Sequence, residues 1–248
     1  MMNNIRLCVI IPTYNNEKTV LKVVEDVHQY VKDVIVVNDG STDATAETLR
    51  QAGQFVSVIS HERNKGKGQA LLSGIYVAKS RGFTHIITID ADGQHFASDI
   101  PVLLSATKHN SEGIIVGHRN LTETNMPRGN TFANKFSNFW FRLQTTINLP
   151  DTQSGYRLYN LSSLKGLRWI TARYESELEL LVFAAWGGVK ITSVPIKVYY
   201  PPVEDRVSHF HPVYDFARIS ILNTILCIGA LFYGYPMLMA RKLRKILK

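Results

Sequence analysis

Short apolar runs alternate with longer amphipathic segments through the first half of this 248-residue chain. The runs are rich in Val and Ile and have the length of strands, whereas the segments between them carry apolar residues near helical spacing. Strands that alternate with helices of this length predict βαβ units and a mostly parallel sheet. We expect strands at Leu7–Ile11, Val34–Val37, Val56–Ile59, His85–Ile89 and Ile114–Val116, and helices at Glu17–Tyr30, Asp43–Ala52, Gly68–Ser80 and Asp99–His109.

The second half of the chain has fewer clear elements. Helical patterns cover Asn130–Thr145 and Glu175–Ala185, and "VKITSVPIKVYY" predicts a late strand pair or an extended segment. Glu175 and Glu179 are expected on a solvated helical face. No internal repeat or low-complexity tract interrupts this region.

Polar residues gather in the loops that follow the apolar runs. "PTYNNE" follows the first run, "NDGSTD" the second and "DADGQH" the fourth. In open parallel sheets, ligands bind beyond the carboxyl ends of the strands. The sequence therefore predicts a binding site where these three loops meet.

The stretch "THIITIDADGQHF" ends a buried strand with two aspartates one residue apart, Asp90 and Asp92. Two neighbouring carboxylates repel each other, and burying them is costly unless a cation lies between them. Hard oxygen ligands suit Mg²⁺ or Mn²⁺, held partly by a substrate diphosphate. The alternative is that both residues only cap the next turn, since Asp-Gly is a common turn pair. The position after a buried strand favours the metal.

Composition narrows the class of protein. Hydrophobic residues make up 45% of the chain and charged residues 19%, as in a folded protein with some additional apolar surface. The two cysteines lie far apart, so no disulfide framework is expected and a reducing compartment is favoured. The N-terminus shows no pattern of a secretory signal peptide. No nucleic-acid-binding signature is present.

The C-terminal end combines an apolar segment with basic charge. Ile219–Met239 carries no formal charge, and the last nine residues, "ARKLRKILK", hold five of the basic residues. The net charge of +8 thus falls to +3 without them (8 − 5 = 3). This arrangement favours a membrane-surface anchor. "GYP" at 234–236 is expected to interrupt the segment, and basic residues on the far side would oppose the positive-inside tendency. We therefore expect a re-entrant or interfacial anchor on the cytoplasmic face, with a spanning helix or a buried soluble helix as alternatives.

Several motifs in order resemble the family 2 glycosyltransferases of the GT-A fold, especially dolichyl-phosphate mannose synthases and bacterial polyprenyl-phosphate sugar synthases. They are "VIIPTYNNEKTV", "VIVVNDGSTDAT", "NKGKGQALLSGI", "TIDADGQH", "VGHRN", "DTQSGYRLY", "YESELELLVFAAWGGVKITSVPI" and "DRVSHF". The resemblance implies a GT-A domain over residues 1–212, a mostly parallel sheet flanked by helices, and a membrane-associating tail over 213–248. It implies transfer of a sugar from a nucleotide-diphosphate donor to a lipid-linked acceptor, a polyprenyl phosphate, with inversion and with Mg²⁺ or Mn²⁺.

The resemblance also implies roles for individual residues. The metal ligands would be Asp90, Asp92 and Gln94, and catalysis would depend on Asp92, Glu177 and Arg206. The acceptor phosphate would bind to Arg119, Arg128 and Arg206. The nucleotide-sugar pocket would include Pro12, Tyr14, Glu17, Asp39, Lys67, Asp90, Arg119 and Gln153. Guanidinium groups are suited to a diphosphate because they donate bidentate hydrogen bonds. The same arginines, and Lys67, could instead be solvated surface charges.

The acceptor remains open at this point. If it is a hydroxyl of a saccharide or glycolipid, Glu177 or Asp151 could act as general base. If it is a lipid phosphate, already ionised at neutral pH, no base is needed. A scaffold that binds nucleotide without catalysis is a further alternative, disfavoured by the intact acidic motifs. The sequence leaves the oligomeric state open.

Overall fold

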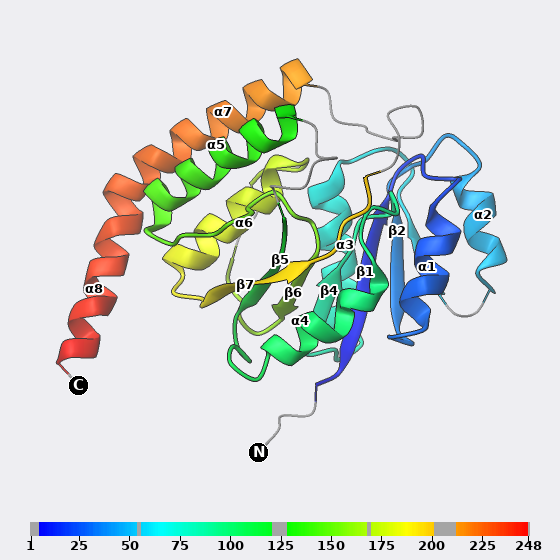
Figure 1. Ribbon diagram of the computed structural model, residues 1–248, viewed down its shortest axis with the longest axis horizontal. Coiled ribbons are helices and arrows are strands. Elements are labelled where there is room, and N and C mark those ends of the chain that lie inside the picture. Colours follow the sequence, from blue (N-terminus) through cyan, green and yellow to red (C-terminus); the bar gives the residue numbers. More distant parts are fainter. Residues whose placement is uncertain (1–4, 54–55, 121–127, 168–169, 201–211, 248) are drawn as a thin grey trace.

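Seven strands form one sheet in the order β3–β2–β1–β4–β6–β5–β7 in the computed structural model, which describes residues 5–53, 56–120, 128–167, 170–200 and 212–247 (Figure 1). All strands are parallel except β6, which runs antiparallel to both of its neighbours. The mostly parallel sheet predicted from the sequence is thus confirmed. The strands are β1 (Leu7–Thr13), β2 (Val34–Asn38), β3 (Val56–Ser60), β4 (His85–Thr88), β5 (Ile114–Arg119), β6 (Arg157–Asn160) and β7 (Ile191–Ile196).

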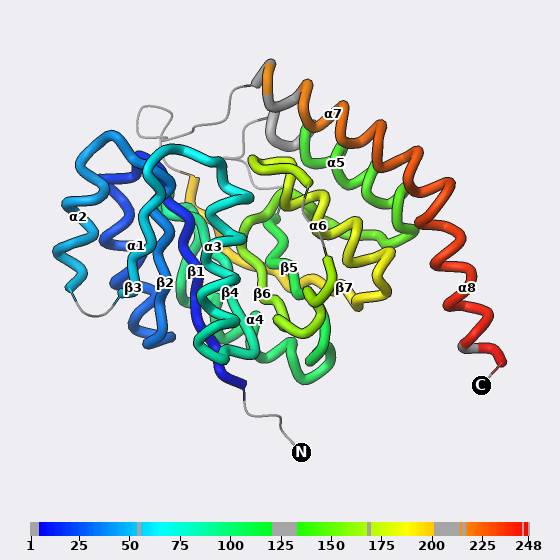
Figure 2. The backbone as a smooth tube through the Cα atoms, turned by 180° about the vertical axis from the view of Figure 1, so that it is seen from behind, coloured from blue at the N-terminus to red at the C-terminus, as the bar shows by residue number. Residues whose placement is uncertain are grey.

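Helices cover both faces of the sheet and create two apolar cores. One core lies between the sheet and α3, α5, α6 and α7, and the other between the sheet and α1, α2 and α4 (Figure 2). The first of these helical layers carries the C-terminal end of the chain. The helices are α1 (Val20–His28), α2 (Thr45–Gln51), α3 (Lys67–Ser80), a 3₁₀ turn (Ala97–Asp99), α4 (Ile100–Ala106), α5 (Arg128–Thr145), α6 (Glu175–Trp186), α7 (Pro212–Gly229), a π-helical turn (Ala230–Gly234) and α8 (Tyr235–Ile246).

The chain reverses its direction of travel across the sheet between β1 and β4. It first builds β1, β2 and β3 outward on one side, and then returns to place β4 on the other side of β1. β1, β2 and β4 are almost entirely buried, because their Val and Ile side chains pack into the cores on both faces. A ligand crevice is expected at the carboxyl ends beside such a reversal.

The antiparallel strand β6 was not predicted. Its sequence, "RLYN", is only four residues long and begins with a charged residue, so it lacks the apolar run that marked the other strands. It is nevertheless central, because it joins β4 to β5 and carries the fully buried Leu158 and Tyr159. The C-terminal prediction of a strand pair or extended segment resolves into one strand, β7.

α6 is buried on nearly all sides, which corrects the expectation of a solvated acidic face. Glu175 and Glu179 are 4% and 0% exposed. Glu179 accepts hydrogen bonds from the N–H groups of Ile170 and Thr171, at 2.9 and 2.8 Å, and so secures the loop that leads into the helix. The prediction failed for Glu179 because main-chain donors from a preceding loop satisfy its carboxylate, which an amphipathic pattern does not reveal. Glu175 is instead buried beside Arg218, with Oε1 3.5 Å from Arg218 Nε.

The apolar C-terminal segment is one continuous helical rod, so the expected interruption at 234–236 is wrong. α7 passes through the π-helical turn into α8 without reversing. Pro236 lies in the first turn of α8, next to the widened turn, where its missing N–H removes no regular α-helical bond. Ala217–Arg244 is long and apolar enough to cross a membrane. Only 28% of an apolar 18-residue stretch within it is buried in the protein, whereas a core helix would be mostly buried.

Candidate active site

A cavity of about 550 Å³ opens at the carboxyl ends of β1, β2 and β4, at the predicted crevice. The three loops that the sequence singled out contribute to it, together with the start of α3 and the segment before α6. Its walls are formed by Pro12, Thr13, Tyr14, Asn15, Asn16, Asp39, Asn64, Gly66, Lys67, Ala70, Asp90, Ala91, Asp92, Gln94, Arg173 and Tyr174.

Lys67 lies between two carboxylates at the inner end of this cavity. Its Nζ is 2.7 Å from Asp90 Oδ1 and 2.7 Å from Glu177 Oε2. Burial alone would lower the pKa of Lys67, but the two carboxylates raise it above its ordinary value, so the ammonium stays charged. Lys67 is therefore part of the cavity wall. The alternative interpretation, a solvated surface charge, does not hold for it.

Asp90 and Asp92 lie close enough to affect each other's ionisation. Burial would raise the pKa of Asp90, but Lys67 holds it below its usual range. Asp92 lacks such a cation: burial, and then the charge of Asp90, raise its pKa to about 6. One Asp92 oxygen, Oδ1, accepts the N–H of Gln94 at 2.9 Å. The pair thus combines one carboxylate that is neutralised by Lys67 and one that is poorly compensated.

Gly155 lies directly against this cluster. A Cβ at this position would stand 2.6 Å from Asp90 Oδ2 and 2.8 Å from Lys67 Nζ, both closer than real contacts allow. The carbonyl of Gly155 accepts a hydrogen bond from Thr88 Oγ1, at the end of β4, at 2.7 Å. The "TQSGYR" segment is thereby fixed against the strand that bears the acidic pair.

Asp39 lines the cavity and holds the loop before α3. Its oxygens accept the N–H groups of Lys65 and Gly66, at 2.9 and 2.7 Å, and lie 2.6 Å from His61 Nδ1. Gly66 has φ +97°, a conformation that L side chains rarely adopt. His61, whose other ring nitrogen lies 2.9 Å from Ser73 Oγ, was missed from the sequence. Asp39 therefore shapes the wall of the cavity as well as facing it.

His95, directly after the acidic motif, is held neutral. Burial lowers the pKa of its imidazole to about 4. Its Nδ1 is buried and has no hydrogen-bond partner among the described residues, and its ring centroid lies 5.3 Å from that of Tyr156.

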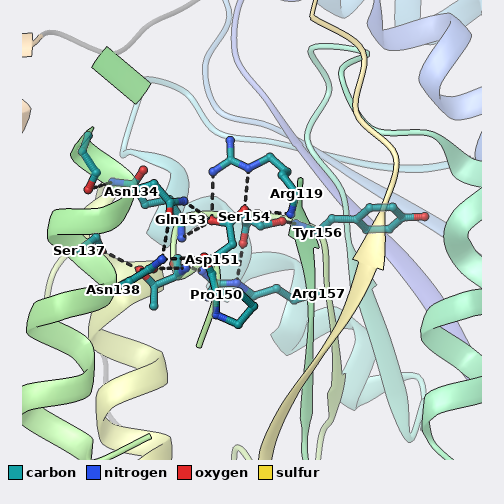
Figure 3. Close-up of polar contacts among 12 residues, drawn as sticks. Arg119, Asn134, Ser137, Asn138, Pro150, Asp151, Gln153, Ser154, Tyr156 and Arg157 are labelled. Atoms are coloured by element: carbon teal, nitrogen blue, oxygen red, sulfur yellow. Dashed lines mark hydrogen bonds and ion pairs between the residues drawn. The ribbon is translucent and has the colours of Figure 1, made fainter. Parts of the chain in front are cut away.

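Asp151 belongs to a second, fully satisfied polar cluster (Figure 3). Arg119 donates to it through Nε at 2.7 Å and Nη2 at 3.1 Å, and Asn134 Nδ2 lies 2.5 Å from Oδ1. The N–H groups of Arg119, Gln153 and Ser154 also point to it. Burial would raise the pKa of Asp151, but Arg119 and these donors lower it. A carboxylate this well satisfied is a poor general base, which removes one of the two candidates.

Arg157 is a second residue near the site, after His61, that sequence reasoning missed. It is fully buried, and its guanidinium donates to the carbonyl oxygens of Ser154 at 2.7 Å, Thr152 at 2.9 Å and Glu177 at 2.8 Å. It therefore ties the "DTQSG" loop to the first turn of α6. The available signal was a charged residue within the aromatic, strand-like "YRLYN".

The remaining predicted residues are placed as follows. Pro12 and Tyr14 lie on the cavity wall. Glu17 and Gln153 are exposed and are not among its lining residues; Glu17 instead accepts the N–H of Ala44 before α2, at 2.9 Å. Arg119 lines a neighbouring cavity of about 390 Å³. Arg206 and the side chain of Arg128 lie outside the described residues.

A divalent cation fits the donor set at the cavity. Among the described residues, no group of three or more His, Cys, Asp or Glu side chains could hold a metal. Asp90, Asp92 and Gln94, however, supply hard oxygen atoms on one wall, beside open space that a diphosphate could share. Burial, and then the charge of Asp90, raise the pKa of Asp92, so a cation beside the pair would stabilise its ionised form.

Comparisons with known proteins place the chain in a family. The profile described as "Glycosyl transferase family 2" matches residues 8–168. The UDP-N-acetylglucosamine--dolichyl-phosphate N-acetylglucosaminyltransferase of Methanococcus voltae is 34% identical over 77% of this chain and 84% of its own length. The polyprenol monophosphomannose synthase of Mycolicibacterium smegmatis is 30% identical over 77% and 76%.

A solved structure shares the fold. Glucosyl-3-phosphoglycerate synthase from Mycobacterium tuberculosis, in complex with Mn²⁺, UDP and phosphoglyceric acid, matches with a TM-score of 0.69 at 19% identity. The match covers 92% of this chain and 78% of that one. The fold is therefore that of the GT-A enzymes, and the chain belongs to glycosyltransferase family 2.

Proposed function

We propose that this glycosyltransferase moves a sugar from a nucleotide-diphosphate donor to a polyprenyl phosphate, with a divalent cation and with inversion at the sugar. The observation that carries the proposal is the cavity that gathers Asp39, Lys67, Asp90, Asp92 and Gln94 at the carboxyl ends of the strands. The names of the Methanococcus and Mycolicibacterium relatives, which refer to dolichyl phosphate and polyprenol, support a lipid-phosphate acceptor.

Bond changes in the proposed step are simple. An oxygen of the acceptor phosphate attacks the anomeric carbon, and the bond from that carbon to the diphosphate oxygen breaks, so nucleoside diphosphate departs. Bound Mg²⁺ or Mn²⁺ would neutralise charge on that diphosphate. Asp92, Asp90 and Gln94, which line the cavity, are the residues that would hold it. The Mycobacterium tuberculosis structure of the same fold contains Mn²⁺ together with UDP.

Lys67 gives the site a cation of its own. It lies on the cavity wall with its ammonium between Asp90 and Glu177, and in this proposal it also contacts a donor phosphate. In this proposal Asp39, Pro12 and Tyr14 border the nucleotide. Arg119, Arg128, Arg206, Glu17 and Gln153 retain the donor- and acceptor-binding roles expected from the sequence.

Acceptor chemistry separates this proposal from its alternative. A phosphate needs no general base, and Asp151 is already committed to Arg119 and its other donors. A hydroxyl acceptor would need one, and Glu177 is available: its Oε1 is buried and has no hydrogen-bond partner among the described residues. That oxygen is the specific observation in favour of transfer to a saccharide or glycolipid hydroxyl.

A donor and acceptor screen tests the proposed reaction. Purified protein is incubated with Mn²⁺ or Mg²⁺, a panel of UDP- and GDP-sugars, and either a polyprenyl phosphate or a neutral glycolipid. Nucleotide release and the mass of the lipid product are measured. We expect a lipid product with one donor and the phosphate acceptor, and none after chelation. A product only with the neutral glycolipid would support the alternative.

Glu177→Gln distinguishes the two mechanisms in one protein. The amide keeps an oxygen toward Lys67 but cannot accept a proton. With a phosphate acceptor, we expect the pH dependence of turnover to keep its shape. With a hydroxyl acceptor, turnover falls by about 10²–10⁴-fold and the base limb of the profile disappears. Glu112→Gln, at an exposed position between α4 and β5, serves as the matched control.

A further inference from the structure

One side of the C-terminal rod is apolar and exposed over its whole length. Positions three, four or seven residues apart share this side, as expected for one face of a helix. Phe232 is the most exposed aromatic residue on it, at 82%. The exposed face consists of Ile221, Ile225, Ile228, Leu231, Phe232, Met239, Leu243 and Ile246.

The rod also contacts the catalytic domain near both of its ends. At the start of α7, Arg218 Nε lies 3.5 Å from the buried carboxylate of Glu175 on α6. Far along α8, Arg241 Nη1 donates to the carbonyl oxygen of Trp186, the last residue of α6, at 2.6 Å. From 218 to 241 the rod extends about 35 Å at 1.5 Å per residue.

Contacts between these ends are equally specific. Gln144 on α5 donates to the buried Asn223 Oδ1 at 3.0 Å, and the indole N–H of Trp186 donates to the Gln144 carbonyl oxygen at 2.8 Å. A Cβ at Gly234 would stand 2.4 Å from Trp186 Nε1, so the rod is packed tightly on this ring. α5 and α7 lie side by side in both views (Figures 1 and 2).

This packing is incompatible with a rod that crosses the bilayer. A hydrocarbon core is about 30 Å thick, which is less than the length over which the rod is attached to the domain. Spanning would therefore draw α5 into the hydrocarbon, including its exposed Lys135 and Arg142. Charged side chains at that depth are costly.

Exposed basic residues on α5 and α8 suit an anionic lipid surface. Lys135 and Arg142 on α5 flank its exposed Phe139 and Leu143, and Lys242 and Arg244 are exposed on α8. Basic residues beside an apolar helical face are typical of helices that lie in the membrane interface. Asp and Glu are absent from 217–247.

We propose that the exposed face of α7 and α8 lies in the plane of an anionic lipid surface and that the rod does not span it. The inference rests on the proposed function for the presence of the acceptor in that membrane. Of the two arrangements expected from the sequence, re-entrant and interfacial, it selects the interfacial one, and it treats α7 and α8 as part of the surface of the catalytic domain.

Vesicle flotation tests lipid binding of the full chain. Phosphatidylcholine vesicles, with and without phosphatidylglycerol, are mixed with protein and the floated fraction is measured. We expect binding that requires phosphatidylglycerol and weakens with salt. Phe232→Glu should reduce the partition coefficient about tenfold or more, because it replaces an apolar ring by a charge. Tyr76→Glu, at a site on α3 that is 75% exposed, should leave it unchanged.

Depth measurements distinguish an in-plane rod from a spanning one. Nitroxide labels are placed singly at Ile221, Leu231 and Leu243 in a Cys227→Ser chain; Cys8 is fully buried and takes no label. An in-plane rod gives three similar depths of about 5–10 Å. A central label near ~15 Å with shallow end labels is the signature of a spanning helix and overturns the proposal.

Other outcomes are equally decisive. A Phe232-dependent dimer without vesicle binding would assign the face to a second copy of the chain. Metal-dependent binding of nucleoside diphosphate by Phe232→Glu reports on the proposed function independently. If the variant binds nucleotide and still floats like the wild type, the membrane inference fails while the proposed function stands. If wild type floats but forms no lipid product, the proposed function fails while the membrane inference stands.

Discussion

Asp151 and Asp92 are two carboxylates at the same edge of the sheet. They differ in how many hydrogen bonds the protein donates to them. Asp151 accepts hydrogen bonds from two guanidinium nitrogens of Arg119, from Asn134 and from three main-chain N–H groups. Asp92 has a main-chain bond from Gln94 and faces open space. The pKa of the first is lowered and that of the second is raised to about 6.

The difference separates a carboxylate that the protein satisfies completely from one that it leaves facing a cavity. Donors that surround Asp151 stabilise its charge and leave no lone pair for a substrate. Asp92, after burial and beside Asp90, carries a charge that the protein alone compensates poorly. A buried group left in that state costs stability, and such groups are concentrated at functional sites. The comparison predicts opposite results for the same substitution at the two positions.

Asp151→Asn should have the largest effect, and the effect is on stability. The amide leaves Arg119 as a nearly buried cation without a counter-charge and turns an N–H₂ group toward existing donors. Breaking such a pair costs about 3–5 kcal/mol, a large part of the stability of a domain. Urea unfolding measures this loss.

Asp33→Asn, at an exposed position before β2, provides the control and should change stability by no more than about 0.5 kcal/mol. A stable Asp151→Asn protein without turnover would reverse the comparison, since it would make Asp151 a participant in the reaction.

Asp92→Asn should be folded and inactive. The amide keeps an oxygen for the Gln94 N–H but removes the charge that holds a cation near the diphosphate. We expect turnover to fall by about 10²–10³-fold, the size typical of losing one electrostatic contact to the transition state. Nucleotide release measures turnover, and Asp26→Asn, on the outer face of α1, is the control. Undiminished wild-type turnover in the presence of chelator would exclude the metal role.

The sequence was sufficient to predict the wall of the site that contains Asp39, Asp90 and Asp92. Each of these residues follows a run of β-branched residues, and the carboxyl ends of parallel strands converge at one edge. The strand cores and the helices between them were also predictable, because their burial follows a regular period.

The second half of the molecule resisted prediction for a different physical reason. Arg157 is satisfied by carbonyl oxygens of the loop just before it and of the distant Glu177, and Glu179 is satisfied by N–H groups of a preceding loop. Such partners are set by tertiary packing and leave no periodic trace. The rod that passes Pro236 was mispredicted because a π-helical turn absorbs the residue that would end an α-helix.

The smallest expected effect is that of Asp92→Asn on the stability of the metal-free protein. It tests most directly whether the protein compensates Asp92 less well than Asp151. The folded-state pKa of Asp92, about 6, lies above its unfolded value of 3.8. The folded protein therefore holds this proton more tightly than the unfolded chain does between about pH 4 and pH 6. The contribution of Asp92 to the free energy of unfolding falls as the pH rises through this window and is then constant. Above pH 6 its ionised form costs about 1–3 kcal/mol, at 1.36 kcal/mol per pKa unit.

Asp92→Asn should thus be more stable than wild type by this amount at pH 7.5, and equal to it near pH 4. Taking the difference between the two proteins cancels the contributions of acids that do not interact with Asp92, whereas Asp90, which does interact with it, contributes to the difference. Added Mn²⁺ should stabilise wild type and not the variant. A variant that is less stable than wild type at pH 7.5 without metal would mean that the protein compensates Asp92 as fully as it does Asp151.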